Sequence, residues 1–542
     1  MKLRLLSSLT KVFSDKEPNF LEFTEFSALK NEVFSFQLAL FPEEDSETVV
    51  SLSLESRLKS RTSIYSVKAM PSRLSHSENH DCFYYEKRSE YPDLLLPIKN
   101  EAVLKKNEWN ALWYEYSPKK NLCGKRRTKI TVTCTDGTAY EKVFVLNIID
   151  ALLPPQKLLY TNWFHNDCLC TYYSVEPFSK EYWQIAENYV ENAVNHGMNM
   201  ILTPIFTPPL DTEVGKERPT FQLVDVKRDG GRWYFGYRKF ERYIKMCLKC
   251  GIEAFEISHL FTQWGAKAAP KIVAEENGEL KRVFGWETDA AGAEYRSFLE
   301  QFAASFTGET EKLGIKERCF MHVSDEPGIG DIESYKKGAL LLHSLFKGFR
   351  FIDALSDLEF FKSGLVYTPI PCENEADVFL PEVENFWTYY CCGQVTDFLP
   401  NRLFSMPSQR NRVLGFLLYK YNAEGFLQWG HNFWYSQYSK RALNPFEETD
   451  AGEAFPSGDS FVVYPGENGT PLNSLRHEVF YEGICDLRAL RLLESLTSRE
   501  HVLKLLSLGL DTELTFRDYP HTQEWLLETR ARINREIENH IS

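Results

Sequence analysis

The first part of the chain contains short runs in which apolar and polar positions alternate. The clearest runs cover residues 33–40, 63–67, 129–133 and 142–148, with polar turns between them and almost no helical periodicity. Because several short alternating strands joined by turns are typical of two packed sheets, the pattern predicts an N-terminal β-sandwich over residues 1–153. Leu153-Pro154-Pro155 marks the expected boundary of this domain.

Beyond this boundary, strand-like apolar runs alternate with helical runs, which favours a parallel α/β architecture. The expected strands cover residues 158–165, 199–206, 253–260, 318–324, 349–354, 366–370, 385–391 and 425–429. Eight strands are the count of a (β/α)8 TIM-like barrel, which we expect over residues 154–470.

Helical patterns fill most of the intervals between these strands. The clearest lie at residues 180–196 and 289–313, and a β-hairpin insertion is expected at residues 221–235, turned by Asp229-Gly230-Gly231. Two further helices, over residues 472–496 and 522–539, should pack on the barrel as a C-terminal region of residues 471–542. The predicted fold is therefore a multidomain chain that joins a β domain to an α/β barrel with C-terminal helices.

The balance of charges narrows the range of partners. The chain has 62 Lys and Arg against 76 Asp and Glu, a formal net charge of −14, so neither a nucleic acid nor an anionic membrane is expected as a partner. Residues 1–11 lack the sustained apolar stretch of a signal peptide, and no apolar run is long enough to span a bilayer. We therefore expect a cytoplasmic protein, and the sequence does not indicate its oligomeric state.

Asp325 and Glu326 lie side by side where a mostly apolar run, residues 319–323, comes to its end. Neighbouring side chains of a regular strand point to opposite faces, but this alternation relaxes at the start of a loop, so both carboxylates can face one cleft. Pro327 should favour extended backbone at Glu326. Paired carboxylates at the carboxyl end of a strand are typical of glycosidase barrels. A capped strand end that leads into a helix near Asp331 is the alternative interpretation.

Other expected strand ends carry aromatic, amide and imidazole side chains, which suit a hydroxyl-rich ligand such as a sugar. Each such residue also has a plain structural explanation, because a single polar group at a strand end is usually hydrogen-bonded there. Their occurrence on one predicted rim favours a binding site. The candidates are Asp167, His259, Trp264, Tyr389, Tyr390, Trp429 and Asn432.

A metal site is less well supported by the spacing of possible ligands. His165, His259 and Asp167 are candidate ligands, but neither His-x-His nor HExxH spacing accompanies them. Cys247 and Cys250 have redox spacing, yet they lie in an amphipathic run, and no second pair completes a zinc site. Without an export signal, reduced cysteines are expected. We expect no metal and no cofactor.

Several stretches of the chain match one known family, in the same order along the sequence. They cover residues 30–37, 165–168, 204–212, 259–266, 322–327, 387–392, 425–433, 463–466 and 474–476. On these motifs the chain resembles glycoside hydrolase family 123 and its relatives, long catalogued as a domain of unknown function. The resemblance extends over nearly the whole chain, and several ordered motifs are far more specific than any single one.

This resemblance implies a β-sandwich followed by a (β/α)8 barrel that releases terminal β-linked N-acetylgalactosamine with retention. The 2-acetamido oxygen of the sugar would attack the anomeric carbon and form an oxazolinium ion, so the enzyme itself would supply no nucleophile. Asp325 would stay ionised and accept a hydrogen bond from the acetamido N–H. Glu326 would protonate the leaving oxygen and then deprotonate the incoming water.

The remaining candidates receive roles from their position and chemistry. Tyr389, or otherwise Tyr390, would donate a hydrogen bond to the acetamide oxygen. The indoles of Trp264 and Trp429 would wall the pocket. The sugar hydroxyls would be read by Asn432, His259 and Asp167.

Two rival interpretations stay open. The chain is a glycosidase of other sugar specificity that uses the same two acids, or a non-catalytic glycan-binding protein on a degenerate barrel. Retention of both carboxylates weighs against the second. The choice between an axial and an equatorial 4-hydroxyl depends on one or two hydrogen bonds that the sequence does not locate. In each case the expected partner is a carbohydrate.

Overall fold

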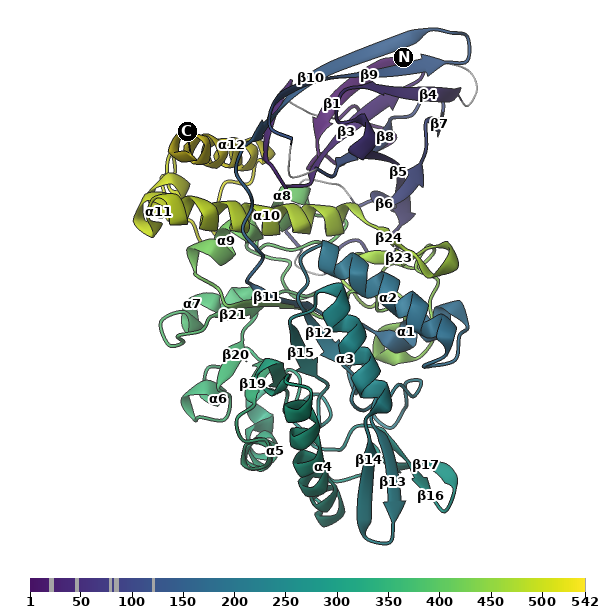
Figure 1. Ribbon diagram of the computed structural model, residues 1–542, viewed down its shortest axis with the longest axis vertical. Coiled ribbons are helices and arrows are strands. Elements are labelled where there is room, and N and C mark those ends of the chain that lie inside the picture. Colours follow the sequence, from purple (N-terminus) through teal and green to yellow (C-terminus); the bar gives the residue numbers. More distant parts are fainter. Residues whose placement is uncertain (19–23, 44–47, 78–79, 82–86, 119–121, 542) are drawn as a thin grey trace.

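The fold was analysed in a computed structural model, which describes residues 1–18, 24–43, 48–77, 80–81, 87–118 and 122–541. Sheets dominate the N-terminal part, a parallel barrel follows, and long helices lie beside both (Figure 1). Among the helices of the described ranges, none is both long and apolar enough to cross a membrane. The cysteines that these ranges contain are free thiols.

Two five-stranded sheets form the N-terminal part, and we call them the N-terminal sheets. The first has the order β1 (Lys2–Ser7), β3 (Phe34–Phe41), β8 (Asn110–Tyr116), β5 (Thr62–Pro71) and β6 (Glu90–Ile98). The second has the order β2 (Glu25–Leu29), β10 (Ala139–Ile149), β9 (Gly124–Cys134), β4 (Thr48–Glu55) and β7 (Glu101–Leu104). Alternate side chains of both sheets meet in one core, as the alternating sequence pattern predicts.

Eight parallel strands follow in one sheet, and each lies within the range expected from the sequence. Their order is β20 (Thr368–Ile370), β19 (Arg350–Ala354), β18 (Cys319–Met321), β15 (Ala254–Ile257), β12 (Met200–Thr203), β11 (Leu159–Asn162), β22 (Gly425–Gln428) and β21 (Trp387–Tyr389). The two edge strands, β20 and β21, approach each other. The amide of Tyr389 in β21 donates to the carbonyl of Pro371, just after β20, over 3.1 Å. The sheet is thereby a nearly closed barrel.

Side chains inside and outside the barrel alternate along each short strand. In β12, Met200 and Leu202 pack with Ile352 of β19 in the interior, whereas Ile201 packs against the surrounding helices. This two-sided burial explains why the barrel strands read as continuous apolar runs in the sequence.

Helices connect the barrel strands and cover them. They are α1 (Asn166–Tyr173), α2 (Lys180–Asn195), α3 (Arg238–Cys250), α4 (Ala293–Lys312), α5 (Ile332–Leu345), α6 (Glu359–Lys362), α7 (Ala376–Phe379), α8 (Ser408–Arg412) and α9 (Leu414–Lys420). The expected hairpin is present as β13 (Asp225–Asp229) and β14 (Arg232–Gly236). A second hairpin, β16 (Ile272–Glu276) and β17 (Glu279–Phe284), was not expected; it pairs with the first through β13 and β16.

A seam between the N-terminal sheets and the barrel is crossed by the C-terminal helices. After the small hairpin of β23 (Val463–Pro465) and β24 (Pro471–Asn473) come α10 (Leu475–Leu496), α11 (Arg499–Leu506) and α12 (Gln523–Ile541). Helix α10 runs between the sheets and the barrel, and the C-terminus lies beside the sheets (Figure 1). The expected division of the chain at residues 153 and 470 stays a prediction.

Buried ion pairs hold this seam together. Arg476 of α10 donates to both oxygens of Asp93 in β6, over 2.8 and 2.9 Å, and the hydroxyl of Tyr464 donates to the same carboxylate. Arg410 of α8 donates to Asp81 over 2.6 Å. Each guanidinium is buried, and removal of its partner would leave an uncompensated buried charge. Each arginine therefore depends on its carboxylate partner.

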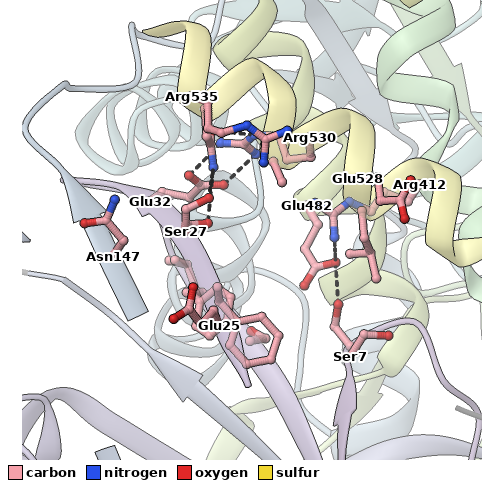
Figure 2. Close-up of a pocket in the computed structure, with 18 of the residues that line it drawn as sticks. Ser7, Glu25, Ser27, Glu32, Asn147, Arg412, Glu482, Glu528, Arg530 and Arg535 are labelled. Carbon is pink, nitrogen blue, oxygen red and sulfur yellow. Dashed lines mark hydrogen bonds and ion pairs between the residues drawn. The ribbon is translucent and has the colours of Figure 1, made fainter. Parts of the chain in front are cut away.

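A cavity of about 420 Å3 lies in the same seam, and Figure 2 shows its charged lining. Arg530 of α12 forms a bidentate pair with Glu32 over 2.7 Å and also contacts Asp486. Arg412 pairs with Asp486 and Glu482. These charged side chains pair with one another, so this cavity belongs to the seam between the N-terminal sheets and the barrel. It lies away from the carboxyl ends of the barrel strands.

Candidate active site

A second cavity, of about 180 Å3, opens at the carboxyl ends of the barrel strands. This is the end at which barrel enzymes carry their functional residues. Segments that follow β11, β12, β15, β18, β21 and β22 all contribute to it. Its lining consists of Trp163, His165, Leu210, Asp211, Gln263, Trp264, Asp325, Glu326, Ala354, Tyr389, Cys391, Cys392, Leu427, Trp429, Gln437, Tyr438 and Phe455.

Asp325 and Glu326 both face this cavity, as the sequence predicts for a strand end. Asp325 is half-buried and Glu326 is exposed. The backbone of Glu326 has a φ of +41°, in the left-handed region, so the expectation that Pro327 would keep it extended is wrong. Its amide donates to the carbonyl of Ala354 at the end of β19, over 3.0 Å, and this bond holds a conformation that costs about 1–3 kcal/mol.

Tyr389 lies opposite the carboxylate pair, at the end of β21. Its hydroxyl donates to Oε1 of Glu326 over 2.6 Å. The next residue, Tyr390, points away from the cavity: it is fully buried, packs against Phe426 and donates to Asn411. Of the two tyrosines considered from the sequence, the structure therefore brings only Tyr389 to the cavity.

The electrostatics of the pair differ from the expectation that Asp325 is the ionised partner. Burial, followed by the nearby charge of Glu326, raises the pKa of Asp325 well above its usual range, and the buried cation His322 opposes this rise only in part. Asp325 therefore keeps its proton to a higher pH than an exposed aspartate does.

Trp264 and Trp429 are the two exposed or partly buried indoles that line the cavity beside buried Trp163. Trp264 is 38% exposed, and its amide donates to the carbonyl of Asp325 over 2.9 Å, which fixes the indole beside the pair. Its ring meets Tyr438 edge to face, with 5.9 Å between centroids. The indole N–H of Trp429 donates to Asp459, whose pKa burial raises to about 7.

Asp167 does not line the cavity. It forms a buried bidentate ion pair with Arg218, with N–O distances of 3.0 and 2.8 Å. Arg218 also donates to the carbonyl of Leu210 over 2.9 Å and to Nδ1 of His165. Asp167 thus anchors the segment after β12 that brings Leu210 and Asp211 to the cavity.

Asn432 and His259 also lie behind the cavity wall. The side chain of Asn432 accepts from the amide of His165 and donates to its carbonyl, so it fixes the backbone at the end of β11. His259 lies inside the barrel and stacks on His322, with 4.2 Å between ring centroids. Neither side chain is among those that line the cavity.

Of the three metal ligands considered from the sequence, Asp167 and His165 are engaged elsewhere, whereas His259 has no hydrogen-bond partner at either ring nitrogen among the residues that the structure describes. Asp167 pairs with Arg218, and His165 uses both ring nitrogens, one toward Arg218 and one toward the carbonyl of Trp429. Within the described ranges, His259, His322 and Asp353 do have potential ligand atoms within 4.8 Å of one another. Both nitrogens of His322 already contact carboxylates. The two imidazoles are stacked, so their nitrogens do not converge on one point as metal ligands would. This group therefore favours an internal hydrogen-bond network over a metal site.

Several cavity residues escaped the sequence analysis because they come from loops. Asp211 accepts from the amide of Tyr438 over 3.1 Å, and Gln263 accepts from the amide of Asp211 over 2.7 Å. Burial raises the pKa of Asp211 to about 6. Both lie in stretches on which the resemblance to a known family rests, residues 204–212 and 259–266, but they were not chosen as candidates.

Comparison with known proteins gives one family and one close structural likeness. Residues 163–493 match the family described as glycoside hydrolase 123, catalytic domain. The solved structure of a family 123 glycoside hydrolase from Clostridium perfringens, studied for glycolipid glycan hydrolysis, superposes with a TM-score of 0.74 at 15% identity, covering 100% of this chain and 98% of that one. At this identity the likeness establishes a shared fold.

Two other solved structures are too dissimilar to this chain to support an inference about it. A family 39 glycoside hydrolase from Bacteroides cellulosilyticus has a TM-score of 0.34 at 8% identity, covering 90% of this chain and 83% of that chain. A family 5 xyloglucanase from Bacteroides ovatus has a TM-score of 0.30 at 10% identity, covering 89% and 100%. No curated protein sequence matches the chain.

Proposed function

The chain belongs to glycoside hydrolase family 123 and is therefore a glycosidase, and we propose that it releases terminal β-linked N-acetylgalactosamine with retention, by substrate assistance. The observation that carries this proposal is the adjacent pair Asp325 and Glu326 on one wall of the cavity. The proposed reaction passes through an oxazolinium ion that the substrate's own acetamido group forms.

The carboxylates of the cavity support a nucleophile that comes from the sugar. A retaining enzyme with its own nucleophile needs a second carboxylate about 5–5.5 Å from the acid, across the scissile bond. Besides the pair, the cavity lining holds one carboxylate, Asp211, which is engaged with the Tyr438 amide. It serves to join two loops, so the acetamido oxygen is left as the attacking group.

The depths of the two acids support their division of labour. Half-buried Asp325 is suited to accept a hydrogen bond from the acetamido N–H and to stabilise the positive charge of the oxazolinium ion. Exposed Glu326 can reach both the leaving oxygen and the incoming water. As the acetamido oxygen bonds to the anomeric carbon, the glycosidic bond breaks and Glu326 gives its proton to the leaving oxygen. Water then attacks the anomeric carbon from the face that the leaving group left, while Glu326 takes a proton from the water. The bond between the anomeric carbon and the acetamido oxygen breaks in this step.

Substrate binding favours the ionised form of Asp325 that this mechanism needs. An acetamido N–H that donates to Asp325 stabilises the charged form of that carboxylate. Because attack within one molecule needs no encounter, this arrangement supplies much of the rate advantage.

The walls of the cavity suit one sugar unit. Its volume of about 180 Å3 is below the range of about 300–1,000 Å3 that is common for larger ligands, which supports removal of a terminal residue. Trp264 and Trp429 offer faces for the C–H patches of the ring. We propose that the Tyr389 hydroxyl turns from Glu326 to the acetamide oxygen when the sugar binds.

Asp167, His259, Tyr390 and Asn432 take no direct contact with the sugar in this proposal. Their contacts assign them to the support of the cavity, through Arg218, His322, Asn411 and the His165 backbone. The sugar hydroxyls would then be recognised by the lining residues, among which Gln263 and Gln437 have side-chain amides.

A panel of aryl β-glycosides tests the proposal: N-acetylgalactosaminide, N-acetylglucosaminide, galactoside and glucoside. We expect turnover of the acetamido sugars, fastest for the galactosaminide. Turnover of plain galactoside or glucoside would remove the acetamide from the mechanism and favour a glycosidase of other specificity. If the whole panel is inert but sugar still binds, the rival glycan-binding interpretation holds.

A further inference from the structure

His322 lies inside the barrel, directly behind the carboxylate pair, between two buried acids. Its Nε2 is 2.7 Å from Oε1 of Glu256 in β15, and its Nδ1 is 3.1 Å from Oδ1 of Asp353 in β19. A neutral imidazole has one N–H donor and one bare acceptor nitrogen. Since both neighbours are carboxylates, an imidazolium, which has a donor at each nitrogen, satisfies both contacts at once.

The surroundings of His322 agree with a permanent charge. Burial alone would lower its pKa, but the hydrogen bonds to Asp353 and Glu256 outweigh burial and raise the pKa to about 9. His259, stacked against it, has a pKa lowered well below the usual range by burial and by the charge of His322, and is therefore neutral. The remaining titratable neighbours are Tyr335, which donates to Asp353, and Asp325.

Each of the two acids also holds a part of the active site. Glu256 accepts from the indole N–H of Trp163 over 2.7 Å and from the hydroxyl of Thr161 over 2.6 Å. Trp163 lines the catalytic cavity. Asp353 accepts from the amide of Val323, two residues before Asp325, over 3.1 and 3.2 Å.

From this geometry we propose that His322 is a positioning residue of the reaction, a buried imidazolium that donates to both Glu256 and Asp353 and so orients the two carboxylates that fix Trp163 and the backbone leading to Asp325. The proposal rests on the function assigned to the Asp325–Glu326 pair. His322 itself reaches neither substrate nor reacting atoms; it acts through its two partners.

Loss of the charge has two consequences for the site. One of the two carboxylates loses its donor and takes a proton or turns away, so its hold on Trp163 or on Val323 weakens. In addition, the positive charge that partly offsets Glu256 and Asp353 disappears beside Asp325. Ionised Asp325, which the oxazolinium ion needs, then becomes harder to form.

The protonation state is measured directly by NMR on the full-length protein with 15N-labelled histidine. We expect one imidazole, identified by its absence in His322→Gln, to show N–H signals at both nitrogens at pH 7 and to lose one of them near pH 9. A neutral His322 at pH 7 overturns the proposal whatever the kinetics. This arm needs only the wild-type fold for its main result.

Kinetics then separate positioning from plain structural support. The substrate is an N-acetylgalactosaminide with a dinitrophenyl leaving group, which needs no proton from Glu326 and so removes that group from the alkaline limb. We expect wild-type kcat to fall above about pH 9 and His322→Gln to have a pH-independent kcat there, about 10-fold below wild type at pH 7, with KM little changed. His343→Gln, on the outer helix α5, controls for loss of a histidine.

The outcomes distinguish this inference from the proposed function. If wild type is active and His322→Gln matches it in kcat and in the alkaline limb, the inference fails while the function stands. If His322→Gln is misfolded by circular dichroism, His322→Asn provides the NMR assignment and the kinetic comparison in its place. If wild type hydrolyses none of the panel, the proposed function fails and the positioning role fails with it.

Discussion

Tyr389 donates its phenolic hydrogen to Glu326 in the cavity at the carboxyl ends of the barrel strands, over 2.6 Å. The contact joins the end of β21 to the loop after β18, two strands that are not neighbours in the barrel. It gives the exposed carboxylate of Glu326 a fixed donor within the cavity that it shares with Asp325. Burial and the charge of Glu326 raise the pKa of Tyr389 well above its usual range, so the hydroxyl stays a donor across the working pH range.

Replacement of Tyr389 by Phe should lower kcat by about 10- to 100-fold, because a hydrogen bond to a charged group is lost from the reacting pair. The ring itself remains, so KM and the melting temperature should change little. Steady-state hydrolysis of the aryl N-acetylgalactosaminide measures this. Tyr367→Phe, on an exposed ring, is the matched control; equal rates in both variants would contradict the role.

Glu326→Gln should lose about 100- to 10,000-fold in kcat on a poor leaving group, since general acid catalysis contributes that much. A substrate with a dinitrophenyl leaving group needs no protonation, so part of the rate should return. The comparison of the two substrates in wild type and variant isolates the acid role. A uniform loss with both substrates would assign Glu326 to binding instead.

Asp325→Asn should abolish most hydrolysis and yet raise the melting temperature at pH 7. The folded state raises the pKa of Asp325, so its ionisation costs stability as pH rises from about 3.9, the unfolded value, toward the folded value. Asparagine carries no such cost. In calorimetric scans at one rate, the variant should have a higher melting temperature than wild type at pH 7. The two melting temperatures should be equal near pH 4.

Exposed Asp511→Asn serves as the control for this stability effect, with no pH-dependent difference expected. A melting temperature of Asp325→Asn that falls below wild type at neutral pH would mean that Asp325 supports the fold through its charge.

Asp167→Leu tests whether Asp167 reads the sugar or holds a loop. Its removal leaves the Arg218 guanidinium buried without its carboxylate, at a cost of about 3–5 kcal/mol. The double change Asp167→Leu with Arg218→Met should recover much of that loss in chemical denaturation. A rise in KM with unchanged stability would instead support a direct contact with a sugar hydroxyl.

The strands were predictable because burial on both faces leaves a local mark. All eight barrel strands lie inside the expected ranges, shortened at one or both ends where the chain turns into loops. Long helices such as α2 and α4 were likewise predictable from their apolar stripe. The second hairpin, β16–β17, was missed because its polar strand β17 is largely exposed and has no apolar run.

The presence of Asp325 and Glu326 together in one cavity was predictable, whereas the contacts that support them were not. Asp325 and Glu326 stand together in the chain, so one stretch of sequence holds both. The partners that set the cavity come together only in the fold: Asp211 meets Tyr438 across 227 residues, and Arg218 meets Asp167 across 51. A usable signal existed for Glu256, which is a charged residue inside an otherwise apolar strand run.

The ion pairs across the seam make the two ends of the chain depend on each other. A protein shortened to residues 154–542 would keep three buried arginines but lose the carboxylates that face them, namely Asp81, Asp93 and Glu32. Truncation would expose the face on which these arginines lie and leave their cations without the carboxylates that the full chain provides. We therefore expect residues 154–542 alone to be less stable than the full chain.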